Sequence, residues 1–383
     1  MTKIVLLGCG FHGRGIAYQL ARAPGVALTV LDRDGALAAE VGRKAGVPAG
    51  SVDVHDSAGL AQALDGADAV VNAVGPYHRS ALKVIDAAIA AGAHYADMAD
   101  DHEVAEAVLL DPQWEARAKA AGITVLIACG VVPGLSGMLV SYGTKQLDST
   151  ESVAVRFGWN YSRQYPAAIQ HFLRINSGRG PQVVDGEMVR KAPLDGREDV
   201  DFLPPVGRTS IFFTGVPDPV GIARFVPGVR QATSKGAFYQ DEANRLLGDM
   251  IRWGFTAYDA PSGETTAPMD YLVRYLGSPA GERFFEIPRR EVPLAVRVDI
   301  AGGKDGRATR LGFEAHDHSR RATTAFTAQA ALSVAKGEQA PGVLSPEGWP
   351  TPGPFLRELL RDKHIDIYAW RDGGKAAPLA VEG

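Results

Sequence analysis

The first thirty residues constrain the fold of this chain more than any other stretch. A short apolar run, Ile4 to Leu7, leads into the turn Gly8-Cys9-Gly10-Phe11-His12-Gly13 and then into a helix-compatible run, Arg14 to Arg22. A second apolar run, Val26 to Leu31, ends in Asp32. This order of strand, glycine turn, helix, strand and acid is typical of the βαβ unit that binds a dinucleotide.

Each glycine of the turn has a physical task. Gly8 permits the tight turn after the strand, Gly10 lets the backbone approach a pyrophosphate, and Gly13 lets the helix pack on the sheet. The helix N-terminus offers N–H groups and a positive dipole end to the phosphates, and Asp32 is placed to bind the adenosine ribose. The pattern predicts a nicotinamide cofactor. An empty Rossmann-like domain and an S-adenosylmethionine site are the alternatives, and the long helix after the third glycine disfavours the second of these.

The chain length and the net charge limit the functions that this protein can have. The chain has 383 residues, enough for two domains, and a formal net charge of −4. That charge, together with isolated arginine pairs that lack interleaved aromatic residues, predicts no nucleic-acid partner. Two cysteines, Cys9 and Cys129, provide no disulfide framework. With no signal peptide or membrane span evident, we expect a cytoplasmic protein without a membrane partner.

Beyond the opening unit, the chain continues to alternate short apolar strands with alanine-rich helices. The clearest strands are Asp68 to Val74, His94 to Met98 and Ile123 to Ala128. This alternation predicts an α/β fold with a Rossmann-type, doubly wound parallel sheet. Near Glu151 the pattern changes, and alternating runs flank Gly302-Gly303-Lys304-Asp305-Gly306 as in a hairpin. The change predicts an inserted α+β domain with a mixed or antiparallel sheet.

These patterns predict two domains and a tail. Residues 1–130 form the dinucleotide-binding domain, and C-terminal helices within 321–372 complete it because they resemble Rossmann cover helices. Residues 131–320 form a substrate-binding domain. Residues 373–383 are expected to be a flexible tail.

Ligands of an open parallel sheet bind beyond the carboxyl ends of its strands. Two later strand ends carry distinctive loops, Asn72 to His78 and Cys129 to Gly134. We expect the first loop to pass under the nicotinamide ribose and to direct Tyr77 and His78 at the reacting centre. A loop whose side chains only pack is the alternative, especially for His78. The predicted cofactor contacts are Gly8, Gly10, Phe11, His12, Gly13, Asp32, Arg33, Asp53, Val54, Ala73, Val74, Gly75, Pro76, Gly130, Val131 and Pro133.

Asp97, at the end of the strand in YADMADDHEV, is a further candidate for proton handling beside Tyr77 and His78. Acids and a histidine follow it, and a metal cluster is one interpretation. Asp101 is better explained as a helix N-cap. His316-Asp317-His318 ends a strand, where alternation separates the side chains, and a third ligand is missing. We therefore predict no metal site.

The residues now assembled resemble the saccharopine dehydrogenase family, especially its lysine 6-dehydrogenase-like members. The most specific match is the family segment G-x-x-P-G-[LM], which is similar to Gly130, Pro133, Gly134 and Leu135. The wider resemblance lies in GCGFHG at the N-terminus, GAHYADM at Gly92 to Met98, GITVLIACGVVPGLSGMLVSYG at Gly122 to Gly143, and GVLSPE at Gly342 to Glu347.

The resemblance implies a split Rossmann domain and an inserted domain that supplies substrate contacts and a homodimer interface. It also implies NAD(P)-linked oxidation of a C–N bond in an amine or amino acid, with hydride transfer that gives an imine or semialdehyde. The predicted substrate contacts are Tyr77 from the first domain and Arg163 and His171 from the second. We predict NAD rather than NADP, because Asp32 would repel a 2′-phosphate although Arg33 lies beside it.

Two departures from the family pattern leave alternatives open. Val132 stands where many members carry an aspartate before Pro-Gly, which removes one carboxylate that could bind an amine. The sequence of the turn Gly75 to Tyr77 is more similar to the turn of those family members that act as enoyl reductases. Reduction of a C=C or C=N bond by NAD(P)H is therefore the alternative reaction. A non-catalytic dinucleotide-sensing protein is the alternative from another class.

Overall fold

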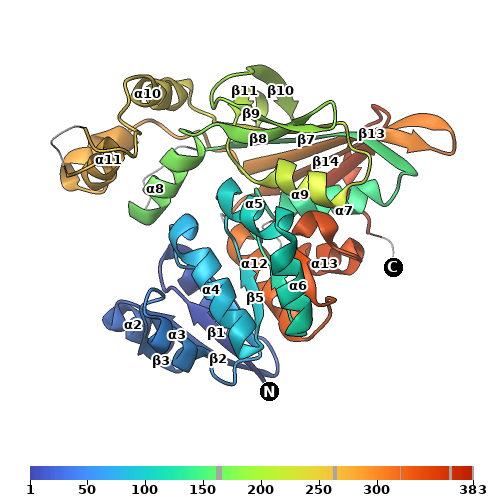
Figure 1. Ribbon diagram of the computed structural model, residues 1–383. Coiled ribbons are helices and arrows are strands. Elements are labelled where there is room, and N and C mark those ends of the chain that lie inside the picture. Colours follow the sequence, from blue (N-terminus) through green and yellow to red (C-terminus); the bar gives the residue numbers. More distant parts are fainter. Residues whose placement is uncertain (161–165, 262–264, 320, 362–364, 382–383) are drawn as a thin grey trace.

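The computed structural model describes residues 1–160, 166–261, 265–319, 321–361 and 365–381. The described chain forms two layers of structure, each built on its own sheet (Figure 1). The parallel sheet and the N-terminus lie in the lower part of the view, and the second sheet lies across the upper part.

The first sheet has seven parallel strands in the order β15-β6-β5-β4-β1-β2-β3. The order reverses beside β1, as it does in doubly wound folds, so the predicted Rossmann-type sheet is confirmed. In chain order the strands are β1 (Thr2–Leu7), β2 (Val26–Asp32), β3 (Ala49–Ser51), β4 (Ala69–Asn72), β5 (His94–Asp97), β6 (Thr124–Leu126) and β15 (Gly342–Leu344).

Helices cover both faces of this sheet, and each helix buries an apolar stripe against it. One face carries α1 (Phe11–Leu20), α2 (Gly35–Ala45) and α12 (Ala322–Ala335). The other face carries a continuous row formed by α3 (Ser57–Leu64), α4 (Tyr77–Ala91), α5 (His102–Leu110) and α6 (Pro112–Ala120). The central strands are therefore buried on both sides, which is why they are nearly all apolar.

The second sheet is mixed and has ten strands along the path β10-β11-β12-β7-β13-β14-β16-β17, with β8 and β9 branching from β12. β7 and β12 pair in parallel, whereas β13 and β14 form the predicted antiparallel hairpin. The strands are β7 (Ser149–Trp159), β8 (Gly180–Val184), β9 (Glu187–Lys191), β10 (Glu198–Phe202), β11 (Gly207–Phe213), β12 (Gln231–Phe238), β13 (Leu294–Lys304), β14 (Arg307–Asp317), β16 (Ile365–Arg371) and β17 (Ala377–Pro378).

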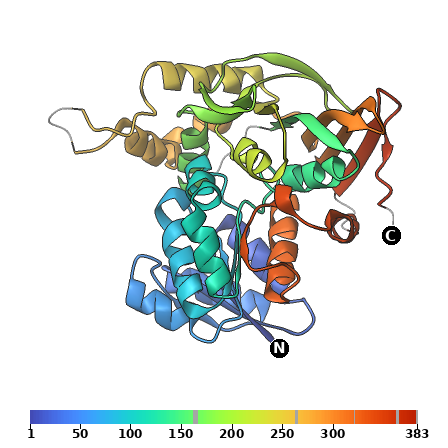
Figure 2. The same ribbon diagram turned by 45° about the vertical axis from the view of Figure 1, so that its right-hand side comes forward.

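Two groups of helices accompany the second sheet. Between it and the first domain lie α7 (Leu135–Thr144) and α9 (Asp218–Phe225), and both views show them there (Figures 1 and 2). At one end of the sheet a separate apolar cluster contains Leu173, Leu247 and Met269. This cluster is formed by α8 (Pro166–Ile175), α10 (Asp241–Arg252), α11 (Pro268–Leu276) and the 3₁₀ helix η1 (Pro279–Phe285).

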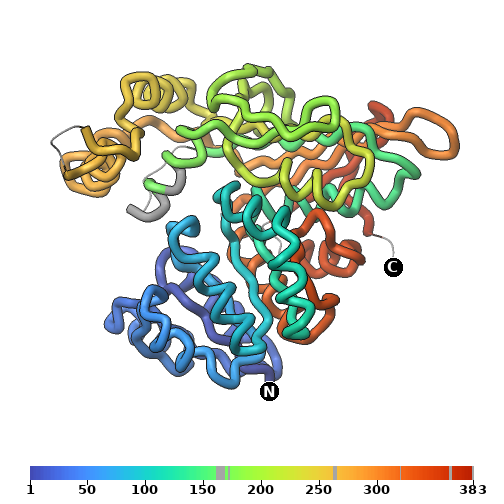
Figure 3. The backbone as a smooth tube through the Cα atoms, in the orientation of Figure 1, coloured from blue at the N-terminus to red at the C-terminus, as the bar shows by residue number. Residues whose placement is uncertain are grey.

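The C-terminal segment differs from the prediction. α12 and β15 pack in the first domain, and a 3₁₀ turn, η2 (Pro346–Gly348), and α13 (Pro352–Leu359) follow. β16 then pairs antiparallel with β14, so residues 365–371 belong to the second sheet (Figure 3). The expected tail also contributes β17. Residues 365–367 alternate in burial, because Ile365 and Ile367 are buried and Asp366 is exposed. This alternation is typical of a strand and not of a cover helix.

Candidate active site

The glycine turn joins β1 to α1 at the carboxyl edge of the first sheet. Gly8 has a φ of +93°, and a Cβ there would lie 2.6 Å from the Ala73 carbonyl oxygen. A Cβ on Gly13 would lie 1.9 Å from the Gly8 oxygen, so both positions require glycine. A Cβ on Gly10, by contrast, would meet no described atom within 4 Å. The backbone at Gly10 therefore faces open space at the N-terminus of α1, where phosphates bind.

Asp32 ends β2 and braces the same turn. Its Oδ2 accepts a hydrogen bond from the Cys9 N–H at 2.7 Å, and its Oδ1 accepts one from the Asp34 N–H at 2.9 Å. The side chain is half-buried, and each carboxylate oxygen keeps a further lone pair for a ribose hydroxyl. Arg33 beside it is exposed. The other two predicted adenosine contacts, Asp53 and Val54, lie in the loop after β3.

The loop after β4 lies next to the glycine turn. The Val74 N–H donates to the Asn72 Oδ1 at 3.0 Å, and the Ser80 hydroxyl donates to the Val74 oxygen at 2.6 Å. The Tyr77 hydroxyl lies 3.5 Å from the Asn72 oxygen. These bonds fix the loop between β4 and α4 against the first turn of the helix.

The loop after β6 is equally constrained. The Gly130 N–H donates to the Pro133 oxygen at 2.9 Å, and the Leu135 N–H donates to the Gly130 oxygen at 3.1 Å. Gly134 has a φ of +129°, and a Cβ there would lie 2.2 Å from the Gly130 oxygen. The resulting tight loop holds Val131 and Val132 at a fixed place beside the first sheet.

A cavity of about 440 Å³ lies between the two domains at this edge, in the size range of small-molecule sites. The first sheet's loops, α1 and α12 line it with Gly10, Phe11, His12, Ala73, Gly75, Pro76, Tyr77, Met98, Asp100, Gly130, Val131, Val132, Pro133 and Thr323. The second domain lines it with Phe157, Trp159, Ile169, Leu173, Ile175, Val216, Phe238, Ala243, Leu246, Leu247, Met250, Leu276, Phe285 and Leu294.

The ionisable side chains among these described lining residues are His12, Tyr77 and Asp100, and all three come from the first domain. Burial lowers the pKa of His12, and its Nδ1 has no hydrogen-bond partner among the described residues. Burial raises the pKa of Tyr77 well above its ordinary value, so this phenol is a neutral donor. The charge of Asp100, which lines the same cavity, acts to raise the pKa of both groups.

Of the three predicted proton-handling residues, Tyr77 borders the cavity and the other two do not line it. Asp97 is fully buried and accepts hydrogen bonds from the Tyr95 hydroxyl at 2.8 Å and the Ala128 N–H at 2.9 Å. Burial raises its pKa to about 6. It ends β5, where strand alternation directs its side chain into the interior.

His78 follows Tyr77 on α4 and therefore lies on a different face of the helix. Its N–H lies 3.3 Å from the Asp101 Oδ2, and its ring Nδ1 lies 3.6 Å from the Asp101 Oδ1. Asp97 and His78 thus make contacts that hold the surrounding loops, and their role in proton handling stays a prediction.

The predicted substrate contacts of the second domain cannot be placed in the same way. Arg163 lies outside the described residues, and the side chain of His171, a residue of α8, is also outside them. The helix α8 nevertheless borders the cavity through Ile169, Leu173 and Ile175.

Asp100 is the lining residue that the sequence analysis passed over. It follows Asp97 by three residues in the loop after β5, at the same sheet edge as the other ligand loops. The strand-end rule alone points to this loop. Only the loop's path decides that Asp100, and not Asp97, borders the cavity.

Ion pairs between the domains flank the cavity. The Arg174 Nη2 donates to the Glu103 Oε1 at 2.7 Å, and the Arg174 guanidinium lies 5.0 Å from the Tyr258 ring centre. Arg190 of β9 donates to Glu106 at 2.7 Å. Two turns of α5 are therefore tied to the second domain, which fixes the separation of the cavity walls.

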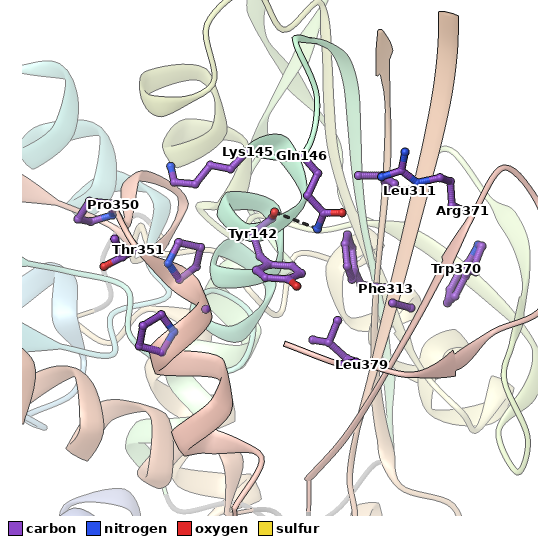
Figure 4. Close-up of a pocket in the computed structure, with 15 residues that line it drawn as sticks. Tyr142, Lys145, Gln146, Leu311, Phe313, Pro350, Thr351, Trp370, Arg371 and Leu379 are labelled. Atoms are coloured by element: carbon purple, nitrogen blue, oxygen red, sulfur yellow. Dashed lines mark hydrogen bonds between the residues drawn. The ribbon is translucent and has the colours of Figure 1, made fainter. Parts of the chain in front are cut away.

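A second hollow, a groove of about 680 Å³, lies elsewhere on the molecule. Figure 4 shows it between α7, the start of α13, and strands β14 and β16. Tyr142, Phe313 and Trp370 line it, with Lys145 and Arg371 at its edge (Figure 4). It shares none of its lining residues with the interdomain cavity, and the loops at the strand ends of the first sheet do not line it. We therefore assign the chemistry to the interdomain cavity.

The site and the fold together define a class of protein. The residues fit a nicotinamide dinucleotide, because Gly10 faces open space at a helix N-terminus and a buried His12 nitrogen lacks a described partner beside it. A dinucleotide-binding sheet whose carboxyl edge is closed by a second domain is the architecture of a two-domain NAD(P)-dependent oxidoreductase.

The chain is similar to known proteins in sequence and in fold. Residues 4–126 match the family model described as the saccharopine dehydrogenase NADP binding domain. It is 24% identical to carboxyaminopropylagmatine dehydrogenase from Synechocystis sp. over 331 residues, which cover 80% of this chain and 79% of the relative.

The fold is similar to that of the apo, histidine-tagged saccharopine dehydrogenase (L-Glu forming) from Saccharomyces cerevisiae, with a TM-score of 0.71. The similarity covers 99% of this chain and 100% of the yeast chain at 16% identity. At that identity the comparison shows a shared two-domain fold.

Neither a cluster of metal-ligating side chains nor a membrane-spanning helix is found among the described residues. No group of three or more histidine, cysteine, aspartate or glutamate side chains in the described ranges is arranged to hold a metal ion. Within the same ranges, every helix is too short or too polar to cross a membrane.

Proposed function

We propose that this protein transfers a hydride between NAD and the carbon of a C–N bond in an amine or amino acid, with an imine or semialdehyde as product. The observation that carries the proposal is the Asp100 carboxylate on the cavity wall, beside the neutral donor Tyr77. A carboxylate in a largely apolar cavity is suited to bind a cationic nitrogen and to accept its proton. The family and the name of the Synechocystis relative support an amine as the substrate.

The chain offers a binding element for each part of the cofactor. The turn Gly8 to Gly13 would hold the pyrophosphate, and Asp32 the adenosine ribose. The loops 73–76 and 130–133 would border the nicotinamide ribose. The nicotinamide, when bound, supplies a two-electron acceptor at its C4 carbon.

The protein's own contribution is to bind, orient and deprotonate the amine. Asp100 accepts a hydrogen bond from the nitrogen and takes its proton. The Tyr77 hydroxyl stays protonated and donates to the same group. Asp97 acts as a positioning residue, because it accepts the N–H groups of Ala99 and Ala128 at 3.0 and 2.9 Å and so holds the Asp100 loop in place. The apolar second wall excludes water and so favours alignment of the carbon with the cofactor.

NAD is proposed over NADP because of Asp32. Its carboxylate is held at the end of β2 by two backbone N–H groups, where a 2′-phosphate would meet a like charge. The family model carries NADP in its description, so cofactor choice is a direct test. Tighter binding of NADP than of NAD, measured by titration, would overturn this part of the proposal.

Three further properties belong to the same proposal. A lysine 6-dehydrogenase-like reaction is supported by the motifs at Gly130 to Leu135. A homodimer is supported by the exposed aromatic side chains of Trp253, Phe255 and Tyr271 on the second domain, which light scattering of the purified protein would test. A cytoplasmic location is supported by two buried, unlinked cysteines.

The experiment is a steady-state assay of reduced-nicotinamide absorbance. L-Lysine, saccharopine, aliphatic diamines and aliphatic monoamines are each tested with NAD and with NADP. Turnover of at least one amine supports the proposal, and no turnover across the panel contradicts it.

Reduction of a C=C or C=N bond is the second candidate reaction. It is favoured by the neutral Tyr77 donor, which suits protonation of a reduced double bond, and by Val132 in place of a carboxylate. Consumption of NADH or NADPH with 2-alkenoyl thioesters or cyclic imines, without amine oxidation, would favour this reaction.

A further inference from the structure

The two walls of the interdomain cavity differ completely in chemistry. Every described side chain that the second domain contributes to the lining is apolar, and none of them is lysine, arginine, aspartate or glutamate. Trp159 is stacked on Phe157 with ring centres 5.2 Å apart and meets Phe238 edge to face at 4.9 Å. The wall is therefore a continuous apolar surface with aromatic residues at its centre.

Two charged residues close in sequence to lining residues are engaged elsewhere. Arg174 lies between the lining residues Leu173 and Ile175, yet its guanidinium is ion-paired with Glu103 at 2.7 Å. Asp218 follows the lining Val216 by two residues, yet it accepts a hydrogen bond from the Ser136 hydroxyl at 2.5 Å and is buried. The side chains of Arg174 and Asp218 thus have partners elsewhere and do not line the cavity.

This wall cannot pair a distal charge of the substrate through its described residues. A carboxylate or ammonium group placed against it would lose its hydration without gaining a partner, which carries a large penalty. A hydrocarbon group placed there gains the full benefit of leaving water. The composition of the wall therefore selects for an apolar substituent.

We propose that the substrate is an apolar amine, whose reacting carbon carries an alkyl chain or aryl group that lies against β7, α8 and α10. The proposal rests on the proposed amine oxidation for the identity of the reacting group. No described residue of this wall would pair a second charged group at the far end of the substrate, so the proposal keeps the lysine 6-dehydrogenase-like chemistry at the C–N bond and replaces lysine by an apolar amine. The C–N carbon would lie near Asp100 and Tyr77, and the hydrocarbon group near Trp159 and Leu246.

The first experiment compares substrates of matched length. n-Pentylamine and 1,5-diaminopentane differ only in the far end, which is a hydrogen in one and an amino group in the other. We expect n-pentylamine to have the higher kcat/KM by at least tenfold. From n-propylamine to n-heptylamine, kcat/KM should rise roughly three- to fourfold per added CH₂ group. Equal or faster turnover of the diamine or of L-lysine would overturn the inference and leave amine oxidation standing.

The second experiment measures binding without catalysis. 1-Heptanol is titrated calorimetrically into the protein without nicotinamide, so that the result does not depend on turnover. We compare wild type, Leu246→Lys and Asp249→Lys, which each add one lysine to α10. Leu246 is half-buried and lines the cavity, whereas Asp249 is exposed and does not line it.

We expect 1-heptanol to bind wild type and Asp249→Lys with equal affinity and to bind Leu246→Lys at least tenfold more weakly. This result supports the apolar site even if no amine is turned over, in which case only the proposed reaction fails. Absence of binding to folded wild type, or equal binding to all three proteins, would overturn the inference.

Discussion

The two walls of the interdomain cavity are built from different kinds of structure. The first wall consists of loops at the ends of parallel strands, and hydrogen bonds hold the loops that carry Tyr77 and Asp100. The second wall consists of helix and strand faces that present only apolar side chains among the described residues. In this protein, the strand-end loops position the ionisable side chains. The packed helix and strand faces set the shape and polarity of the space for the substrate.

The second domain does not lack polar groups near the cavity. Asp218, two residues after the lining Val216, forms a buried acidic pair with Glu347 of η2, and Ser136 and Ser345 donate their hydroxyl hydrogens to them. The second wall is therefore apolar because of how its side chains are oriented as well as because of which residues it contains. The following predictions test each wall in turn.

The largest effect is expected from the first wall. Asp100→Asn removes the proton acceptor with almost no change in shape, so kcat/KM for an amine should fall by about 10²- to 10⁴-fold. The affinity for the dinucleotide, measured by calorimetry, should change little. Asp86→Asn, an exposed position on α4, is the control and should keep full activity. Activity that survives in Asp100→Asn would remove Asp100 from the mechanism.

A smaller effect is expected from the second wall. Trp159→Ala deletes the aromatic centre between Phe157 and Phe238, and KM for an apolar amine should rise roughly tenfold, the loss expected for a large apolar contact. Trp159→Phe keeps a ring there and should recover most of the affinity. Thermal melting of both variants separates a binding effect from loss of folding. An unchanged KM in folded Trp159→Ala would show that the substrate does not reach this wall.

The buried pair of Asp218 and Glu347 predicts that the stability of the fold depends on pH. Burial first, and then the charge of Asp218, raise the pKa of Glu347 from 4.5 to about 8. Between these values the folded state holds a proton that the unfolded state has lost, so the free energy of unfolding falls as pH rises. The slope approaches about 1.4 kcal/mol per pH unit for one proton.

Glu347→Gln should remove most of that slope, because the amide stays neutral at every pH. Urea unfolding of wild type and variant at pH 5, 6, 7 and 8 measures the difference. A variant whose stability changes with pH as steeply as that of wild type would show that Glu347 does not hold the proton.

The smallest effect concerns the adenosine end of the first wall. Asp32→Asn removes a negative charge but keeps a side-chain acceptor for the Cys9 N–H, so the preference for NAD over NADP should fall roughly tenfold. Dissociation constants of both cofactors, compared with those of Arg33→Ala, measure the change. A preference that moves only in Arg33→Ala would assign cofactor choice to the arginine.

The first domain was largely predictable from the sequence for a local physical reason. The tasks of Gly8, Gly10 and Gly13 follow from contacts within one βαβ unit, and the geometry of all three agrees with those tasks. The strand Val26 to Leu31 and Asp32 belong to the same unit. The alternation of strands and helices also predicted the parallel sheet, because buried parallel strands are apolar along their length.

The rest was decided by tertiary structure. Asp97 and Asp100 are indistinguishable in the sequence pattern, and only the path of the loop after β5 places Asp100 at the cavity. Residues 365–371 follow helices of the first domain but pair with β14. Their alternating pattern forms a strand only beside this partner, which lies far away in the sequence.

The apolar wall could not be predicted from the sequence either. Phe157, Leu173, Leu246 and Phe285 lie on four different elements, and no local pattern connects them. Packing alone brings them to one surface and turns Arg174 and Asp218 away from it. The sequence by itself determined the βαβ unit with its glycine turn and terminal acid, since that unit is built from consecutive residues. The polarity of the substrate space was decided by the tertiary structure, since that space is built from faces that meet only in the folded chain.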